Sequence, residues 1–339
     1  AQTYRYCQAH VPIREQTEAT GHAVRACYLY AGMASVAKAT GDPSLLDACR
    51  RLWDNISTRR MYITGGVGSS RFSERFTFDY DLPNEEAYAE TCAAIALVFF
   101  ARNMLECDPD SRYADVMERA LYNSVISGVS LDGRHFFYDN LLASHPEYHK
   151  FSGQKSPRRQ EWFGCACCPP NIARVLASIG SYFYTSNDEA IWAHSYASCD
   201  ATFTVAGQNV RLSQQTNYPW DGDVAIGVHP DQPCSFALAL RIPDWCRQAT
   251  LKVNGKTMAI PAISERGYAV IRRQWQAGDK VELSLAMAPE RIYAHPSVRH
   301  DAGRVALQRG PVVYCLEEMD NGPDLADLRL PPVAELDVH

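Results

Sequence analysis

The chain has 339 residues, of which 46% are hydrophobic and 21% are charged, a composition that places it among ordinary globular proteins. Its formal net charge of −6, with no basic stripe, argues against a nucleic-acid partner. No apolar run approaches the roughly 20 residues that cross a bilayer, which argues against a membrane role.

The sequence begins at Ala1, and residues 3–23 already have the character of a domain interior. We therefore expect that the N-terminal part of a longer protein lies outside this chain. Length alone suggests two domains, or one large domain with an appendage. No apolar leader flanked by Lys or Arg is present. Most of the twelve cysteines are scattered singly, several of them in apolar segments where a free cysteine behaves as a small hydrophobe. This pattern favours a reducing compartment, and we expect a cytoplasmic protein.

The first half of the sequence predicts a series of helices. Residues 23–37 are apolar on nearly every face, as in a helix that is buried on most of its surface. Gly41 ends this helix, and Asp42 with Pro43 begins the next, because Asp caps a helix and Pro fits its first turn. Further helices are predicted over 86–106, 113–125 and 169–183, with long connections at 59–84 and, including short strands, at 129–165.

From about Ser186 onward the pattern changes to short alternating or β-branched runs separated by turns. Asn254-Gly255, directly after one such run, is a strong hairpin signal. Strands are predicted over 202–205, 224–228, 236–242, 249–253, 268–272 and 280–285.

These patterns predict an α+β multidomain fold. We expect a helical region over 1–185, an antiparallel β-sandwich over 186–320 and a Pro- and Asp-rich tail over 321–339. Paired helices joined by long loops are compatible with an (α/α) barrel. Periodicity alone does not separate that barrel from a helical bundle or a solenoid.

Three cysteines gather before a Pro-Pro pair, at Cys165, Cys167 and Cys168. Thiolates are soft ligands that suit zinc, and the rigid Pro-Pro can present sulfur atoms at a helix start. A structural zinc site needs four ligands, and Glu90-Thr91-Cys92 is the natural candidate for the others. Residues i and i+2 of a regular helix point about 200° apart, so the backbone at Glu90 must depart from a helix if Glu90 and Cys92 share one metal. The alternative is three buried or redox-active cysteines without a metal.

The connection over 59–84 carries a glycine-rich stretch at 65–70, followed by several carboxylates. As a phosphate loop it is a weak match, since it lacks the Lys-Ser/Thr ending and follows no clear strand. Most acids in such loops are simply solvated, but a loop dense in carboxylates and aromatic rings also fits a polyol-binding pocket with one acid as proton donor. The residues alone do not choose among Glu74, Asp79, Asp81 and Glu85.

Two further polar side chains are candidates for substrate contact. His22 stands at the start of a predicted buried helix, and Tyr138 lies in an aromatic stretch. Residues in such places are more often core groups with satisfied hydrogen bonds than binding residues.

Four segments in order carry a resemblance to a known family. They are Tyr62-Ile63-Thr64-Gly65-Gly66-Val67-Gly68-Ser69, Asp79-Tyr80-Asp81-Leu82-Pro83-Asn84, Glu90-Thr91-Cys92-Ala93 and Cys167-Cys168-Pro169-Pro170-Asn171. In these segments the chain resembles the β-L-arabinofuranosidases of glycoside hydrolase family 127. The resemblance runs from about Gly21 to Thr185 and continues more weakly through the β region. Two of the four motifs are rare, which makes the resemblance specific.

The resemblance implies a retaining exo-glycosidase that releases L-arabinose from β-L-arabinofuranosides. It implies an (α/α)6 barrel that carries the site and begins well before Ala1, followed by β-sandwich domains. Cys167 would be the nucleophile and Glu74 the general acid/base, while His22 and Tyr138 would contact the arabinofuranose. The implied ligands of Zn²⁺ are Glu90, Cys92, Cys167 and Cys168.

Two other interpretations stay open at this point. One is a carboxylate glycosidase that uses Glu74 with Asp79 or Asp81 and keeps a purely structural zinc. The other is a non-catalytic carbohydrate-binding module. The expected partner is a small oligosaccharide or glycoconjugate, with no nucleic acid and no membrane. The sequence fixes neither linkage nor aglycone, and it leaves the oligomeric state open, with a homo-oligomer among the options.

Overall fold

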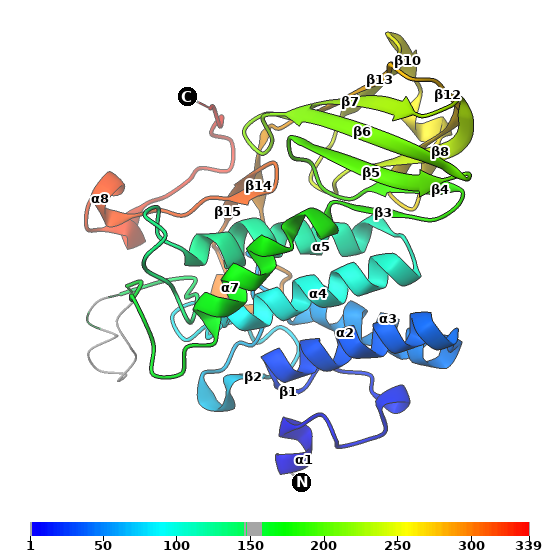
Figure 1. Ribbon diagram of the computed structural model, residues 1–339. Helices are drawn as coiled ribbons and strands as arrows, with labels where there is room; N and C mark the ends of the chain where they lie inside the picture. Colours follow the sequence, from blue (N-terminus) through cyan, green and yellow to red (C-terminus); the bar gives the residue numbers. More distant parts are fainter. Residues whose placement is uncertain (1, 146, 148–157, 339) are drawn as a thin grey trace.

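The computed structural model describes residues 2–145, 147 and 158–338 (Figure 1). A helical region forms one half of the molecule and β-sheets form the other, and the C-terminal segment returns beside the helices. The predicted α+β multidomain class is confirmed. Within the described ranges, no helix combines the length and the apolar character that a bilayer crossing requires.

The helical region packs around one central helix, α4. Helix α4 contacts α2, α5 and α7, and its side chains are buried on nearly every face. Trp53 of α3 packs edge-on against Phe100 of α4 and Tyr113 of α5, with ring centroids 5.3 and 4.9 Å apart. The helices are α1 (Gln2–Tyr6), α2 (Ala23–Thr40), α3 (Pro43–Arg59), α4 (Thr91–Cys107), α5 (Ser111–Ala120), α7 (Cys168–Ala177) and, near the C-terminus, α8 (Glu318–Asn321).

The start of α4 differs from the helix predicted over 86–106. Ala89 has a φ of 38°, Glu90 is extended with φ −58° and ψ 135°, and regular helix begins only at Thr91. The backbone at Glu90 therefore departs from a helix, which is the condition that a metal shared by Glu90 and Cys92 requires.

Two other predicted helices are interrupted. A π-helical turn over Leu121–Val125 follows α5, and a 3₁₀ turn over Ile179–Tyr182 follows α7. In the described residues of 129–165, the predicted short strands are present as isolated bridges such as Val129–Phe136. Residues 146 and 148–157 of that stretch lie outside the described part of the chain.

The long connection after α3 returns to the start of α2. Within it, β2 (Arg75–Phe76) pairs antiparallel with β1 (Gly21–His22), and His22 is opposite Arg75 in the register. This two-stranded sheet places the residue before α2 beside the residues around Glu74.

Beyond residue 183 the chain forms two large sheets that share one hydrophobic core. The six-stranded sheet has the order β10-β9-β13-β7-β6-β5, and the five-stranded sheet has the order β11-β12-β8-β4-β3. Their strands are β3 (Tyr184–Ser186), β4 (Ala190–Ala193), β5 (Cys199–Val205), β6 (Gln208–Thr216), β7 (Asp223–Pro230), β8 (Cys234–Arg241), β9 (Ala249–Val253), β10 (Lys256–Met258), β11 (Ser264–Glu265), β12 (Tyr268–Trp275) and β13 (Asp279–Leu285).

All six predicted strands are present, but the prediction of a purely antiparallel arrangement is wrong. Strands β4 and β8 pair in parallel, because the chain leaves the five-stranded sheet after β4, builds β5 to β7 in the other sheet and then returns. A third sheet of β14 (Pro289–Ile292), β15 (Ala306–Arg309) and β16 (Val312–Val313) follows.

The β region is tied to the helices by buried polar contacts. Arg241 of β8 has no exposed surface and pairs with Asp115 and Glu118 of α5. Near the C-terminus, the backbone N–H of Val313 donates to Asn123, which follows α5, at 2.8 Å. These contacts fix α5 and the π-helical turn after it between the helical core and the sheets.

Candidate functional site

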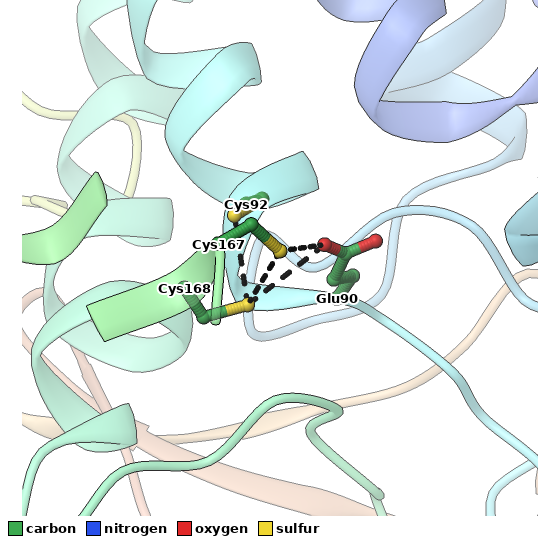
Figure 2. Close-up of side chains that lie close together, drawn as sticks. All are labelled: Glu90, Cys92, Cys167 and Cys168. Atoms are coloured by element: carbon green, nitrogen blue, oxygen red, sulfur yellow. Dashed lines mark hydrogen bonds between the residues drawn. The ribbon is translucent and has the colours of Figure 1, made fainter. Parts of the chain in front are cut away.

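Four potential metal ligands meet where α4 and α7 begin (Figure 2). Cys92 Sγ lies 3.5 Å from Cys168 Sγ, which in turn lies 3.8 Å from Cys167 Sγ. Glu90 Oε1 lies 3.3 Å from Cys167 Sγ and 3.8 Å from Cys168 Sγ. All four ligand atoms lie within 4.8 Å of one another, and we call this set the Glu-Cys cluster. Cys165, the third member of the sequence cluster, is exposed and does not belong to it.

Backbone contacts fix the two halves of the Glu-Cys cluster. Cys167 is the residue before the first turn of α7, where Pro169 and Pro170 occupy the first positions without leaving an N–H unsatisfied. On the other side, the N–H of Thr91 donates to the carbonyl of Tyr138 at 2.9 Å. Tyr138 is thereby held beside the start of α4, and its Oη lies 3.1 Å from Cys167 Sγ.

The electrostatics of the cluster are those of closely spaced groups out of water. Glu90 is 3% exposed, and burial raises its pKa to about 9, with Cys167 and Glu74 acting in the same direction. Hydrogen bonds from the thiols of Cys168 and Cys92 lower the pKa of Cys167, and the same bonding raises the pKa of Cys168. Burial also holds the pKa of Tyr138 far above its usual range, and its hydroxyl oxygen accepts from the Cys167 thiol.

The donor set can hold a metal ion. It offers three sulfurs and one carboxylate oxygen in a compact group, which satisfies the four-ligand rule for structural metal sites. Glu90 Oε2 is buried and makes no hydrogen bond within the described structure. Buried carboxylate oxygens are normally paired, so this one fits an oxygen that faces a ligand rather than a protein donor.

Glu74 lies at the edge of the Glu-Cys cluster and has two hydrogen-bond partners. Its Oε2 is 2.8 Å from Nε2 of His22, and its Oε1 accepts from the hydroxyl of Tyr88 at 2.9 Å. His22, Glu74 and Glu90 form a second group of ligand atoms within 4.8 Å of one another. Ser73 and Glu74 have φ of 61° and 50°, a left-handed conformation that is uncommon outside glycine and that often occurs at functional sites.

The structure separates Glu74 from the other candidate acids. Asp79 is bound by Asn55 and by the guanidinium of Arg60, at 3.1 and 2.6 Å. Asp81 lies 3.9 Å from Arg299 in the C-terminal segment. Neither Asp79, Asp81 nor Glu85 belongs to either ligand group found in the described chain.

Sequence reasoning missed Tyr88. It lies two residues before Glu90, in a stretch that was predicted to be helical. Tyr88 and Glu90 both reach the site although Ala89 between them has a left-handed φ of 38°. No periodic pattern in the sequence signals this backbone conformation.

A pocket of about 100 Å³ adjoins the cluster beside Tyr138. It combines aromatic and polar side chains, and it is lined by Phe137, Tyr138, Asp139, Leu141, Ser144, Arg158, Gln160 and Phe163.

Family models match the chain in three consecutive parts. Residues 1–181 match the β-L-arabinofuranosidase catalytic domain of glycoside hydrolase family 127. Residues 190–287 match the middle domain of the same family, and residues 289–339 match its C-terminal domain.

Characterised relatives and solved structures are also similar to this chain. A non-reducing end β-L-arabinofuranosidase of Bifidobacterium longum subsp. longum is 43% identical over 96% of this chain and 50% of its own length. The crystal structure of a family 127 β-L-arabinofuranosidase from Geobacillus stearothermophilus T6 is 56% identical with a TM-score of 0.97, covering 99% of this chain and 53% of that one. A second solved family 127 β-arabinofuranosidase is 42% identical with a TM-score of 0.87, over 93% and 51% of the two chains. The chain thus spans about half the length of the relatives it matches.

Proposed function

Because the chain belongs to glycoside hydrolase family 127, we propose that the protein is a retaining exo-glycosidase that releases L-arabinose from the non-reducing end of β-L-arabinofuranosides. The observation that carries the proposal is the Glu-Cys cluster with Glu74 at its edge. It supplies a sulfur nucleophile and a separate carboxylate within one site, which are the two groups that a retaining mechanism needs.

We propose that the metal of the Glu-Cys cluster is Zn²⁺, and the distances between its ligands are compatible with this ion. A tetrahedral zinc with Zn–S bonds of about 2.3 Å and a Zn–O bond of about 2.0 Å holds its sulfurs about 3.8 Å apart and its oxygen about 3.5 Å from each sulfur. The observed sulfur separations are 3.5 and 3.8 Å, and the Glu90 oxygen lies 3.3 and 3.8 Å from two sulfurs. Three thiolates and one carboxylate also suit zinc better than a hard cation such as Mg²⁺.

Bound zinc would keep the coordinated thiols deprotonated at neutral pH. We propose Cys167 as the nucleophile because it is more accessible than Cys168 and lies against Tyr138. Its sulfur attacks the anomeric carbon while the bond from that carbon to the leaving oxygen breaks, and Glu74 donates its proton to that oxygen.

The second step returns both groups to their starting state. Glu74 takes a proton from water, the water oxygen attacks the same carbon, and the carbon–sulfur bond breaks. Two inversions at one carbon give net retention. A retaining pair stands about 5 Å apart. Glu74 lies within 4.8 Å of Glu90, which is 3.3 Å from Cys167, so both groups border the same carboxylate, and the proposal requires the sugar to bind between them.

The neighbouring side chains orient these groups and the sugar. His22 and Tyr88 each hold one oxygen of Glu74, which fixes the plane of the carboxyl group. Tyr138 accepts from the Cys167 thiol and lines the adjoining pocket. We propose that His22 and Tyr138 also contact the arabinofuranose hydroxyls.

The carboxylate-only alternative is disfavoured by where its second acid lies. Asp79 is engaged by Arg60 and Asn55, and Asp81 faces Arg299 at 3.9 Å. An acid already paired with an arginine is a poor partner for Glu74.

On the architecture, we propose that α2 to α5 and α7 form part of an (α/α)6 barrel in the whole protein. The boundaries near 185 and 320 and the exact sugar linkage stay predictions, as does the oligomeric state.

Metal analysis on the intact protein, combined with a β-L-arabinofuranoside assay, tests the proposed function. We expect one zinc per chain, less zinc in Glu90→Ala and Cys167→Ala, and no turnover in Cys167→Ala. Cys165→Ala removes the exposed neighbouring thiol and is the matched control, with zinc and turnover unchanged. A folded wild type without stoichiometric zinc, or a Cys167→Ala variant that still turns over, would contradict the proposal.

A further inference from the structure

The segment at 79–84 contributes no group to the Glu-Cys cluster, but the C-terminal region packs against it. The connection between β14 and β15 lies against it. The ring of His295 stacks on Tyr80, with centroids 4.3 Å apart and planes 14° from parallel. Asn84 donates from Nδ2 to Asp301 at 2.9 Å.

Val298 is the apolar centre of this contact. It is 5% exposed and belongs to a small core cluster whose other members come from the helical region: Tyr62, Leu82, Ala87 and Ala89. A valine from the C-terminal region thus belongs to the same core as Ala87 and Ala89, which lie in the segment leading into α4.

Ala89 connects this small core to the candidate site. It is fully buried and has a φ of 38°, a conformation that a non-glycine residue keeps only when its surroundings impose it. Its N–H donates to Gly68 at 2.8 Å, and its carbonyl accepts from Asn140 at 2.9 Å. Its chain neighbours are Tyr88, which donates to Glu74, and Glu90, a member of the Glu-Cys cluster.

We propose that Val298 is a positioning residue: through the core it shares with Ala89, the β14–β15 connection holds the backbone that aims Tyr88 and Glu90 into the site. The C-terminal region thereby acts on the reaction without touching the sugar. The kinetic part of this inference rests on the proposed function, whereas the effect on the backbone does not.

The test compares three variants of the intact protein. Val298→Ala removes two methyl groups from the small core, Val298→Ile keeps the branched side chain and adds one carbon, and Val333→Ala makes the same truncation at a 90% exposed position of the same region. Hydrogen exchange over residues 82–92, zinc content, kcat and KM are measured for each.

In Val298→Ala we expect faster exchange over 87–91 and a kcat lowered about tenfold with KM changed less, because the groups around the reacting atoms lose alignment. Val298→Ile and Val333→Ala should resemble the wild type. Unchanged exchange over 87–91 in a folded Val298→Ala protein overturns the inference, and so does faster exchange with an unchanged kcat. If the wild type itself has no turnover, the proposed function fails while exchange still decides the backbone effect. If Val298→Ala does not fold, Asp301→Ala is measured in the same way. Unchanged exchange over 87–91, or faster exchange with an unchanged kcat, then overturns the inference.

Discussion

The imidazole of His22 lies 2.8 Å from the carboxylate of Glu74, and the helix that His22 caps sets its tautomer. The backbone N–H of Arg25 donates to Nδ1 at 3.3 Å, so that nitrogen is an acceptor and Nε2 carries the proton that points to Glu74. Tyr88 donates to the other carboxylate oxygen at 2.9 Å. Glu74 is therefore oriented from two sides, by the start of α2 and by the segment before α4.

Replacing His22 by Asn should separate its two roles. Asn is a good N-cap, so α2 stays capped, but its shorter side chain does not reach Glu74. We expect kcat/KM to fall about 10- to 100-fold, as for the loss of one hydrogen bond to a charged group, with the melting temperature nearly unchanged. Asp42→Asn, a cap substitution at the start of α3 that also removes the ion pair with Arg14, is the control for activity and should leave kcat/KM unchanged. Equal activity of His22→Asn and wild type would remove His22 from the site.

Replacing Glu74 by Gln keeps its shape and removes proton transfer. We expect kcat/KM to drop about 10²- to 10⁴-fold on substrates with an alkyl leaving group. The drop should be much smaller with a nitrophenyl leaving group, which needs no proton, and azide should restore turnover as the glycosyl azide with retained configuration. Glu86→Gln, at an exposed position of the same loop, serves as control. An equal loss on both substrates without rescue by azide would exclude Glu74 as the acid/base.

Helix caps and periodicity were sufficient to predict much of the fold. Asp42 and Pro43 begin α3 as expected, and the strand predicted at 249–253 is β9 to the residue. The start of α4 was predicted five residues too early, because the apolar pattern continues through Ala87 and Ala89 while the backbone there is extended or left-handed. Those two side chains are buried because they pack into a small separate core, not because they lie on the buried face of a helix. Such tertiary packing cannot be predicted from periodicity.

Part of the candidate site was likewise predictable from the sequence, and part was not. The donor chemistry of Cys167, Cys168 and Glu90 is visible in sequence, because thiols next to one another are rare. The choice of Glu74 among four acids was not visible in sequence. It depends on the pairing of β1 with β2, which brings His22 beside Glu74, 52 positions further along the chain. Resemblance to a family supplied that choice, and the hydrogen bonds of Glu74 support it.

The glycine-rich stretch has a structural role that a methyl group can test. At Gly65 the φ is 80°, and a Cβ would lie 2.6 Å from the Cα of Ala120, at the end of α5. Gly65→Ala should lower the free energy of unfolding by about 2–4 kcal/mol, the sum of left-handed strain and overpacking against backbone. Gly41→Ala has a similar φ of 66° with nothing within 4 Å, so only the strain of about 1 kcal/mol remains. Denaturation midpoints that are equal for the two variants would contradict this.

Buried charges join α5 to the sheets, and one of them should make stability depend on pH. Arg241 is fully buried and faces two carboxyls, Asp115 at 2.6 Å and Glu118, so one positive charge balances only one negative charge. Glu118 also accepts from the hydroxyl of Tyr218 at 2.5 Å and from the indole of Trp245 at 3.2 Å. Asp115 has fewer donors, and burial raises its pKa to about 7 although Arg241 opposes the shift.

A carboxyl group whose pKa is higher in the folded state binds its proton more tightly there than in the unfolded chain. Its contribution is complete below the unfolded value of about 3.9 and is lost as the pH rises through about 7, at up to about 1.4 kcal/mol per pH unit. Between pH 5 and pH 7 the wild type should therefore lose about 1–3 kcal/mol of unfolding free energy relative to Asp115→Asn, which has no proton to lose. Urea midpoints at the two pH values measure this difference. Asp200→Asn, at a 68% exposed aspartate, should follow the wild type. Parallel pH profiles for wild type and Asp115→Asn would mean that Asp115 is ionised throughout and that both carboxylates share Arg241 at neutral pH.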